Sequence, residues 1–210
     1  MPDLQAPELP LEQGDRLSRA AYGTDFGQRY AALHDASCWK LERLQHFEEK
    51  DNASRDALRR GDWPEALRLL DARRDALREE AADDARQGVT FHRIRVVEEP
   101  LTPYMQWELH SHRHRVRYAA EKVRVLPAAE VAAAETGGIL PELTIIGKDT
   151  LFRVVYTAEG APDGAVRYTD PAVVGSWTAY LKDLYAAAED LTGYFDRAVA
   201  PLPPPVTIPE

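Results

Sequence analysis

The chain has 210 residues, 44% of them hydrophobic and 29% charged, and its formal net charge is −9. This length and composition are those of an ordinary globular protein with a single buried core. The acidic balance opposes contact with phosphate backbones, so we expect no direct binding to duplex nucleic acid.

Export and membrane signals are missing from the sequence. No apolar run approaches the roughly 18 residues that a membrane helix needs, so we expect no membrane contact. The N-terminus MPDLQAPELPLEQGD is acidic and Pro-rich, without the basic and apolar regions of a secretory signal. A single cysteine, Cys38, cannot form an internal disulfide, which is typical of a reducing compartment. We therefore expect a cytoplasmic protein.

The first part of the chain is predicted to be helical. Residues 1–24 are interpreted as an N-terminal arm and residues 25–87 as a helical region, in which residues 25–47 follow an imperfect helical period. Asp62-Trp63-Pro64-Glu65 indicates a helix start, with a capping Asp, a Pro in the first turn and an acid near the positive end of the helix dipole. That helix is expected to end at Gly88.

From Gly88 onward the pattern becomes that of strands and helices, and residues 88–200 are predicted to form the sheet-containing core of one domain, residues 25–200. A helix over residues 101–115 separates the first two strands, which should therefore be parallel with a right-handed crossover. A meander of three strands follows. The predicted strands are residues 89–97, 122–126, 143–146, 151–157 and 165–168.

The last helix has the clearest pattern. Asp170 is the expected cap, Pro171 takes the first position, and a broad apolar face continues to Phe195. Residues 201–210 are a Pro-rich tail that favours polyproline II. The predicted fold class is α+β: a mixed sheet of about five strands, a helical N-terminal region, and this long C-terminal helix packed on the sheet.

A local basic region lies in the predicted β-α-β unit. Residues 92–124 hold seven Lys and Arg against four acids, although the chain as a whole is acidic. Guanidinium groups that converge from adjacent strands can bind a carboxylate or a phosphate. The alternative is that a strand arginine pairs with a helix glutamate in the core, for instance Arg95 with Glu108. The candidate ligand-binding residues are Arg93, Arg95, Tyr104, Glu108 and Arg124.

Three histidines, His110, His112 and His114, lie on the predicted helix of the same unit. His110 and His114 are four residues apart and share a helix face, which offers two ligands to a divalent ion, whereas a metal site needs at least three. We therefore predict no bound metal, with the pair His110 and His114 as the alternative. No P-loop or Gly-rich phosphate loop is present, and no cofactor is predicted.

Residues 88–109, the stretch EKVRVLP and the meander LTIIGKDTLFRVVYTAEGAPDGAVRYTDPAVV resemble an actinobacterial domain family of unknown function. The likeness covers about residues 30–195. It implies a fold and a regulatory setting, because genes of this family often lie beside those of helix-turn-helix regulators. The residues that match the family's recurring features are Arg95, Pro100, Tyr104, Trp107, Glu108, Glu121 and Arg124.

Two functions stay open from the sequence. The first is an accessory or regulatory module that binds a small acidic ligand or a partner protein, such as a helix-turn-helix regulator, through the basic region. The alternative is a small-molecule-modifying or phosphodiester-cleaving enzyme, with Glu108 and His112 as catalytic acid and base. The sequence decides neither whether the protein is an enzyme nor its oligomeric state.

Overall fold

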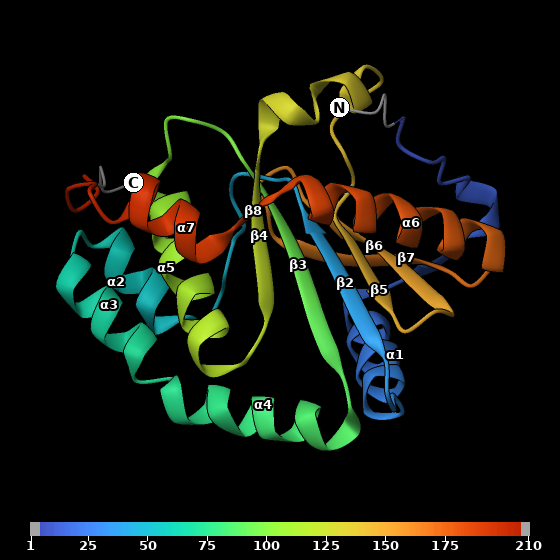
Figure 1. The fold of residues 1–210 in the computed structure, drawn as a ribbon, viewed down its shortest axis with the longest axis horizontal. Coiled ribbons are helices and arrows are strands. Elements are labelled where there is room, and N and C mark those ends of the chain that lie inside the picture. Colours follow the sequence, from blue (N-terminus) through green and yellow to red (C-terminus); the bar gives the residue numbers. More distant parts are fainter. Residues whose placement is uncertain (1–4, 207–210) are drawn as a thin grey trace.

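A computed structural model describes residues 5–206 of the chain, so residues 1–4 of the predicted arm and 207–210 of the predicted tail lie outside it. Within the described range, eight strands form one sheet in the order β1-β7-β6-β5-β2-β3-β4-β8 (Figure 1). The strands are β1 (Asp15–Leu17), β2 (Ser37–Glu42), β3 (Thr90–Val97), β4 (Lys122–Pro127), β5 (Leu143–Ile146), β6 (Thr150–Tyr156), β7 (Pro162–Tyr168) and β8 (Glu189–Asp190).

Helices connect these strands and cover the sheet. The α-helices are α1 (Arg19–Ala31), α2 (Ala53–Arg59), α3 (Trp63–Asp71), α4 (Arg74–Gln87), α5 (Pro103–Tyr118), α6 (Pro171–Ala187) and α7 (Leu191–Tyr194). Short 3-10 turns lie at η1 (Leu11–Gln13), η2 (Ala128–Glu130) and η3 (Ala132–Glu135), and a π-helical segment, η4 (Phe195–Val199), follows α7. No helix in residues 5–206 has the length and apolar character needed to cross a bilayer.

The sheet is mixed, as predicted, but it has eight strands and not about five. Strands β2, β3 and β4 are parallel, and α5 makes the crossover from β3 to β4. The remaining neighbours pair antiparallel, with β5, β6 and β7 forming the predicted meander. The sequence reading missed β1 and β8, which have three and two residues, and β2. The α+β class is confirmed.

The helical interpretation of residues 25–47 is wrong at β2. This strand lies between β5 and β3 in the middle of the sheet, and both of its faces are covered. Trp39 and Leu41 face the core on one side, while Lys40 and Glu42 face charged partners on the other. Because a central strand carried charges on its second face, its alternation was mistaken for an imperfect helical period.

The predicted start and end signals of the next helices are confirmed, but the helix is divided. The side chain of Asp62 caps α3 by accepting from the backbone N–H of Glu65. The chain then bends at Ala72 and Arg73 before α4 begins. Gly88 ends α4 in the left-handed conformation, with φ of 67°, a position that glycine occupies without a steric cost.

The long helix predicted to continue to Phe195 is not found. Asp170 caps α6 as expected, but α6 ends at Ala187 and residues 189–190 pair with β4. The reason lies in the apolar residues, since those of α6 are buried on one face of the sheet while Leu191, Tyr194 and Phe195 join the core on the opposite face. One straight helix cannot serve both faces, so the chain turns around the sheet edge.

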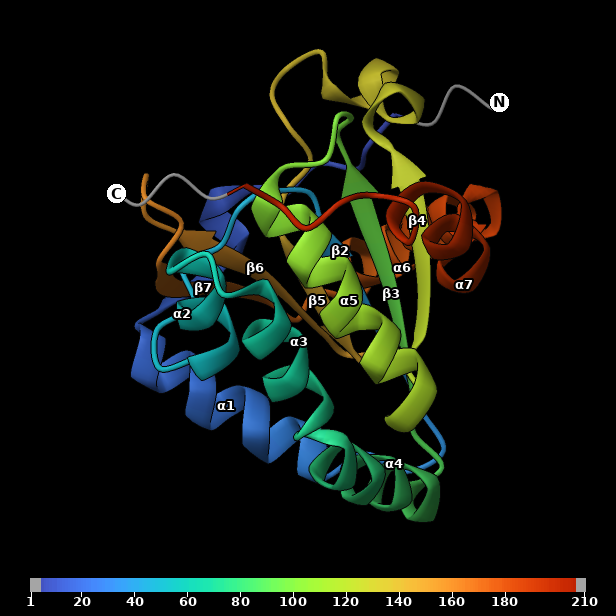
Figure 2. The same cartoon turned by 90° about the vertical axis from the view of Figure 1, so that its left-hand side faces the viewer.

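The two faces of the sheet are covered differently, as Figures 1 and 2 show. Helix α6 packs on one face and contributes Val174, Trp177, Leu181 and Leu184 to the core there. On the opposite face, α1 packs over the meander, and α2, α3 and α5 pack over the β3–β4 side. The central strands β2 and β3 therefore have a less densely covered area between these two groups of helices.

Candidate functional site

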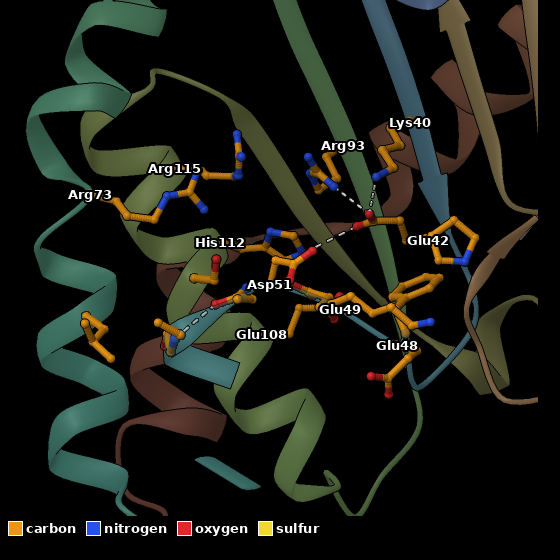
Figure 3. Close-up of a pocket in the computed structure, with 18 of the residues that line it drawn as sticks. Lys40, Glu42, Glu48, Glu49, Asp51, Arg73, Arg93, Glu108, His112 and Arg115 are labelled. Atoms are coloured by element: carbon orange, nitrogen blue, oxygen red, sulfur yellow. Dashed lines mark hydrogen bonds and ion pairs between the residues drawn. The ribbon is translucent and has the colours of Figure 1, made fainter. Parts of the chain in front are cut away.

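A cleft of about 820 Å³ opens over the central strands, on the face opposite α6. Its floor comes from β2 and β3, and its walls come from α1, α3, α5 and the segment before and at the start of α2 (Figure 3). Most of the side chains that line it are charged. These are Arg19, Lys40, Glu42, Glu48, Glu49, Lys50, Asp51, Arg73, Arg93, Glu108 and Arg115, and His112 lies among them.

Strand alternation places the floor residues. In β2, Lys40 and Glu42 point into the cleft because Trp39 and Leu41, at the alternate positions, are buried toward α6. Glu42 is only 4% exposed. Its Oε1 forms an ion pair with Nζ of Lys40 at 2.6 Å and accepts a hydrogen bond from Nη1 of Arg93 at 2.6 Å (Figure 3). A single carboxylate oxygen thus holds two cations at the centre of the floor.

The arginines of β3 are bound in buried ion pairs. Besides its bond to Glu42, Arg93 donates from Nε to Glu121 at 3.1 Å. Arg95 has no exposed surface and donates from Nε to Oε2 of Glu108 at 2.7 Å. The structural pairing of Arg95 with Glu108, offered above as the alternative to a ligand site, is therefore present.

These cations change the acidity of the buried glutamates. Burial alone raises the pKa of Glu42, but Arg93 and Lys40 outweigh it and hold this pKa well below the ordinary 4.5. At Glu121 burial also raises the pKa, but the nearby Arg93 and Arg115 outweigh this effect and lower the pKa to about 2. At Glu142 burial prevails, even though the backbone N–H groups of Leu44 and Arg43 donate to its carboxylate, and the pKa rises to about 7.

His112 lies beside Glu42 and Glu108 in the floor. Its Nε2 is 3.4 Å from Oε2 of Glu42, within ion-pair distance but longer than an ordinary N–H···O hydrogen bond. Each of the three residues offers a ligand atom, and these atoms all lie within 4.8 Å of one another. This is the group within residues 5–206 whose donor atoms have the spacing to hold a metal ion.

The rim of the cleft carries cations of a different kind. Arg19, Lys50 and Arg73 are exposed, and within the described residues their side chains make no ion pair or hydrogen bond. Asp51, an acidic residue of the rim, is also exposed, and its side chain makes no ion pair or hydrogen bond within the described residues. The rim therefore has an excess of unpaired positive charge, whereas the cations of the floor are neutralised by glutamates.

The structure separates the residues that the sequence grouped as a ligand site. Arg93 and Glu108 line the cleft. Arg95 and Tyr104 are buried around Glu108, and the hydroxyl of Tyr104 donates to Oε1 of that glutamate at 3.1 Å. Arg124 is elsewhere: it donates to the backbone oxygen of Tyr185 at 2.9 Å.

The two histidines considered as metal ligands do not line the cleft. The ring of His110 packs edge-on against Trp63 and Phe195, with centroid distances of 5.1 and 4.8 Å. Burial and the nearby Arg113 lower the pKa of His110 to about 4. His114 stacks on Tyr118 at 5.8 Å. Of the three histidines on α5, His112 is the one that faces the sheet and the cleft.

Sequence reasoning did not select several residues of the cleft. Lys40 and Glu42 had a detectable signal, since they alternate with Trp39 and Leu41 as strand residues do. Arg19 and Arg73 had none, because α1 and the bend between α3 and α4 come together at the cleft only in the folded chain. The rim depends on tertiary structure alone.

Fold and site together define a class: an α+β protein with a mixed sheet, one face of which carries a charged cleft over its central strands. The family model described as "domain of unknown function (DUF6879)" matches residues 24–196, and the chain belongs to this family. The resemblance to a domain family of unknown function is thereby confirmed. No curated protein matches the chain.

Among solved structures, the structure of this chain is similar to the structure of TrmBL2, an archaeal chromatin protein that shows a novel mode of DNA binding. The two are 11% identical, with a TM-score of 0.41. The match covers 87% of this chain and 55% of the other, so the chain spans little more than half of that protein.

One expectation from the sequence is corrected here. The net charge led us to exclude duplex nucleic acid as a direct partner, and we withdraw this exclusion, since a DNA-binding chromatin protein is among the similar structures. Net charge describes the whole surface, whereas binding depends on local charge. The likeness itself assigns no ligand or partner to this chain.

Proposed function

We propose that the protein binds a small molecule bearing a phosphate or carboxylate group in the cleft. The observation that carries this proposal is the set of unpaired rim cations Arg19, Lys50 and Arg73 around a cavity of about 820 Å³. A cavity of several hundred Å³ suits a small-molecule ligand. Arginines that have no partner are free to bind an oxyanion through two parallel hydrogen bonds.

The floor supports recognition of more than one group on the ligand. The cations of the floor are neutralised by glutamates, so they attract an anion less strongly than the unpaired cations of the rim do. We therefore propose that the phosphate or carboxylate of the ligand binds at the rim and that its polar groups point toward Glu42 and His112. The actinobacterial setting beside regulatory genes, which the sequence resemblance implies, makes this a sensory or accessory module in our proposal.

The test is binding of defined anions, namely inorganic phosphate, citrate and AMP, measured by calorimetry on EDTA-treated protein. We expect at least one of them to bind, and Arg73→Ala to weaken it about tenfold, the loss of one charged hydrogen bond. Arg60→Ala is the matched control, because Arg60 is exposed but does not line the cleft. Equal effects of the two substitutions would contradict the proposal.

An enzyme is the second candidate, and His112 favours it. Both nitrogens of this ring lack a hydrogen-bond partner among the described residues, and the ring faces the cleft beside Glu42. An imidazole in this position is a candidate for a general acid or base. Both oxygens of Glu108 already accept hydrogen bonds, so Glu42 is better placed to orient it. Hydrolysis of bis-(p-nitrophenyl) phosphate that is lost in His112→Ala and kept in His114→Ala would support this candidate.

A further inference from the structure

We propose that Glu42, Glu108 and His112 form a binding site for a first-row divalent cation such as Mn²⁺ or Zn²⁺. The inference goes beyond anion binding and does not depend on it. Glu42 comes from the end of β2, while Glu108 and His112 are four residues apart and share one face of α5. One ligand atom from each lies within 4.8 Å of the others, the spacing of atoms around a common ion.

Burial without partners is the independent observation that points to a ligand here. The three residues are each 4 to 5% exposed. Oε2 of Glu42 and both ring nitrogens of His112 have no hydrogen-bond partner in the described part of the chain. Buried polar atoms are almost always paired, because leaving one unsatisfied costs about 1–3 kcal/mol. A cation between them would satisfy the carboxylate oxygen and one imidazole nitrogen together.

The surroundings orient the carboxylates for this role. Lys40 and Arg93 both bind Oε1 of Glu42 and leave Oε2 directed at His112. Glu108 is held by Arg95 and by the hydroxyl of Tyr104. Outer hydrogen bonds of this kind fix the direction of metal ligands. Oε2 of Glu42 accepts no hydrogen bond, and each oxygen of Glu108 accepts one and keeps a second lone pair for an ion.

The donor set and the neighbouring charges restrict the ion. One imidazole nitrogen and two carboxylates suit Mn²⁺, Fe²⁺ or Zn²⁺ better than Ca²⁺ or Mg²⁺, which prefer oxygen donors. Lys40, Arg93 and Arg95 partly neutralise the two glutamates, so the electrostatic contribution to binding is reduced. Three protein ligands leave open positions on the side of the cleft.

The test uses the full chain without a histidine tag, stripped with EDTA and placed in a buffer that contains no phosphate or carboxylate. Calorimetry with MnCl₂ or ZnCl₂ alone should show one equivalent bound. Electron spin-echo measurements on the Mn²⁺ protein should show coupling to one imidazole nitrogen. His112→Gln and Glu42→Gln should each weaken binding at least about 100-fold.

His114→Gln is the matched control, because His114 lies on the same helix outside the cleft, and it should bind metal as the wild type does. The proposal is overturned if the wild type binds neither ion, if bound Mn²⁺ shows no nitrogen coupling, or if His114→Gln alone abolishes binding. The wild-type measurements decide the matter even if a buried substitution prevents folding. Metal binding without anion binding would leave this site standing and remove the proposed function.

Discussion

At the scale of single residues, buried ion pairs distinguish this protein from an ordinary α+β core. Arg95 is fully enclosed, and its guanidinium reaches Glu108, the backbone oxygen of Glu42 and the sulfur of Met105. A pair of this kind is costly to desolvate and adds little net stability, but losing one partner leaves the other charge buried. The arginines that looked like ligand residues in sequence therefore have structural partners.

The first prediction follows from that pair. Arg95→Ala should lower the free energy of unfolding by about 3–5 kcal/mol, because it leaves the Glu108 carboxylate buried without its cation. Urea unfolding at pH 7 measures the effect. Arg60→Ala, at an exposed position, should change it by less than about 0.5 kcal/mol. If the two variants unfolded alike, the Arg95–Glu108 pair would not be part of the core.

The second prediction concerns pH and Glu142. Burial raises the pKa of this carboxyl in the folded state to about 7 from the ordinary 4.5, so the folded protein keeps a proton that the unfolded chain releases. The contribution of Glu142 to the free energy of unfolding is therefore fully present below about pH 4.5 and is lost as the pH rises to about 7. The total loss is roughly 3 kcal/mol. The Glu142→Gln side chain cannot ionise, so the stability of this variant should not show that loss.

Unfolding of wild type and Glu142→Gln at pH 5, 6, 7 and 8 tests this. The stability of the variant relative to wild type should increase with pH and level off above about pH 7. Glu121→Gln is the control, since the pKa of Glu121 is lowered to about 2 and its contribution is lost only as the pH falls below about 4.5. A difference for Glu142→Gln that is independent of pH would show that this carboxyl is not shifted.

At the scale of elements, the position of α6 is decided by one face of the helix. Trp177, Leu181 and Leu184 are at most 2% exposed and pack against residues of β2, β3 and β5. Trp177→Ala or Leu184→Ala should cost about 3–5 kcal/mol, because each leaves a cavity that the sheet cannot close. Urea unfolding measures this, and Asp183→Ala on the exposed side is the control. Unchanged unfolding of both core variants would refute this packing.

At the scale of the whole molecule, one continuous sheet joins the core beneath α6 to the cores on its opposite face. Trp39 and Trp177 lie in the core beneath α6, whereas Trp63 and Trp107 lie in the core on the opposite face. Strand β3 contributes side chains to the cores on both faces of the sheet. Loss of packing on one face therefore disturbs the strand against which the other face packs. The single domain over residues 25–200 stays a prediction, and its lower bound leaves out β1, which pairs with β7, and the start of α1.

We therefore expect one cooperative unfolding transition. Tryptophan fluorescence, which reports on both cores, and far-UV circular dichroism, which reports on the helices and strands, should give the same urea midpoint. Single-tryptophan variants that keep Trp177 or Trp107 would follow each core separately. Two separate midpoints would show that the two faces of the sheet unfold independently.

The sequence by itself determined the elements whose signals are local. The cap Asp170, the stop Gly88 and the β-α-β pattern of residues 88–127 follow from short-range periodicity and capping, and the structure contains all three. The pairing of Arg95 with Glu108 was the alternative to the predicted ligand site, and it is a local feature too, because a strand and the helix that follows it are neighbours. These features depend on residues close together in the chain.

Tertiary structure alone decided the rest. Residues 37–42 became a central strand because partners from distant parts of the chain, β3 and β5, complete their hydrogen bonds and neutralise Glu42. The helix after Pro171 ended early because its apolar residues had to reach both faces of the sheet. The cleft joins Arg19, Glu42, Arg73 and His112, whose separations in the chain carry no periodic signal. Contacts of this range are made by the packing of whole elements, which no local pattern encodes.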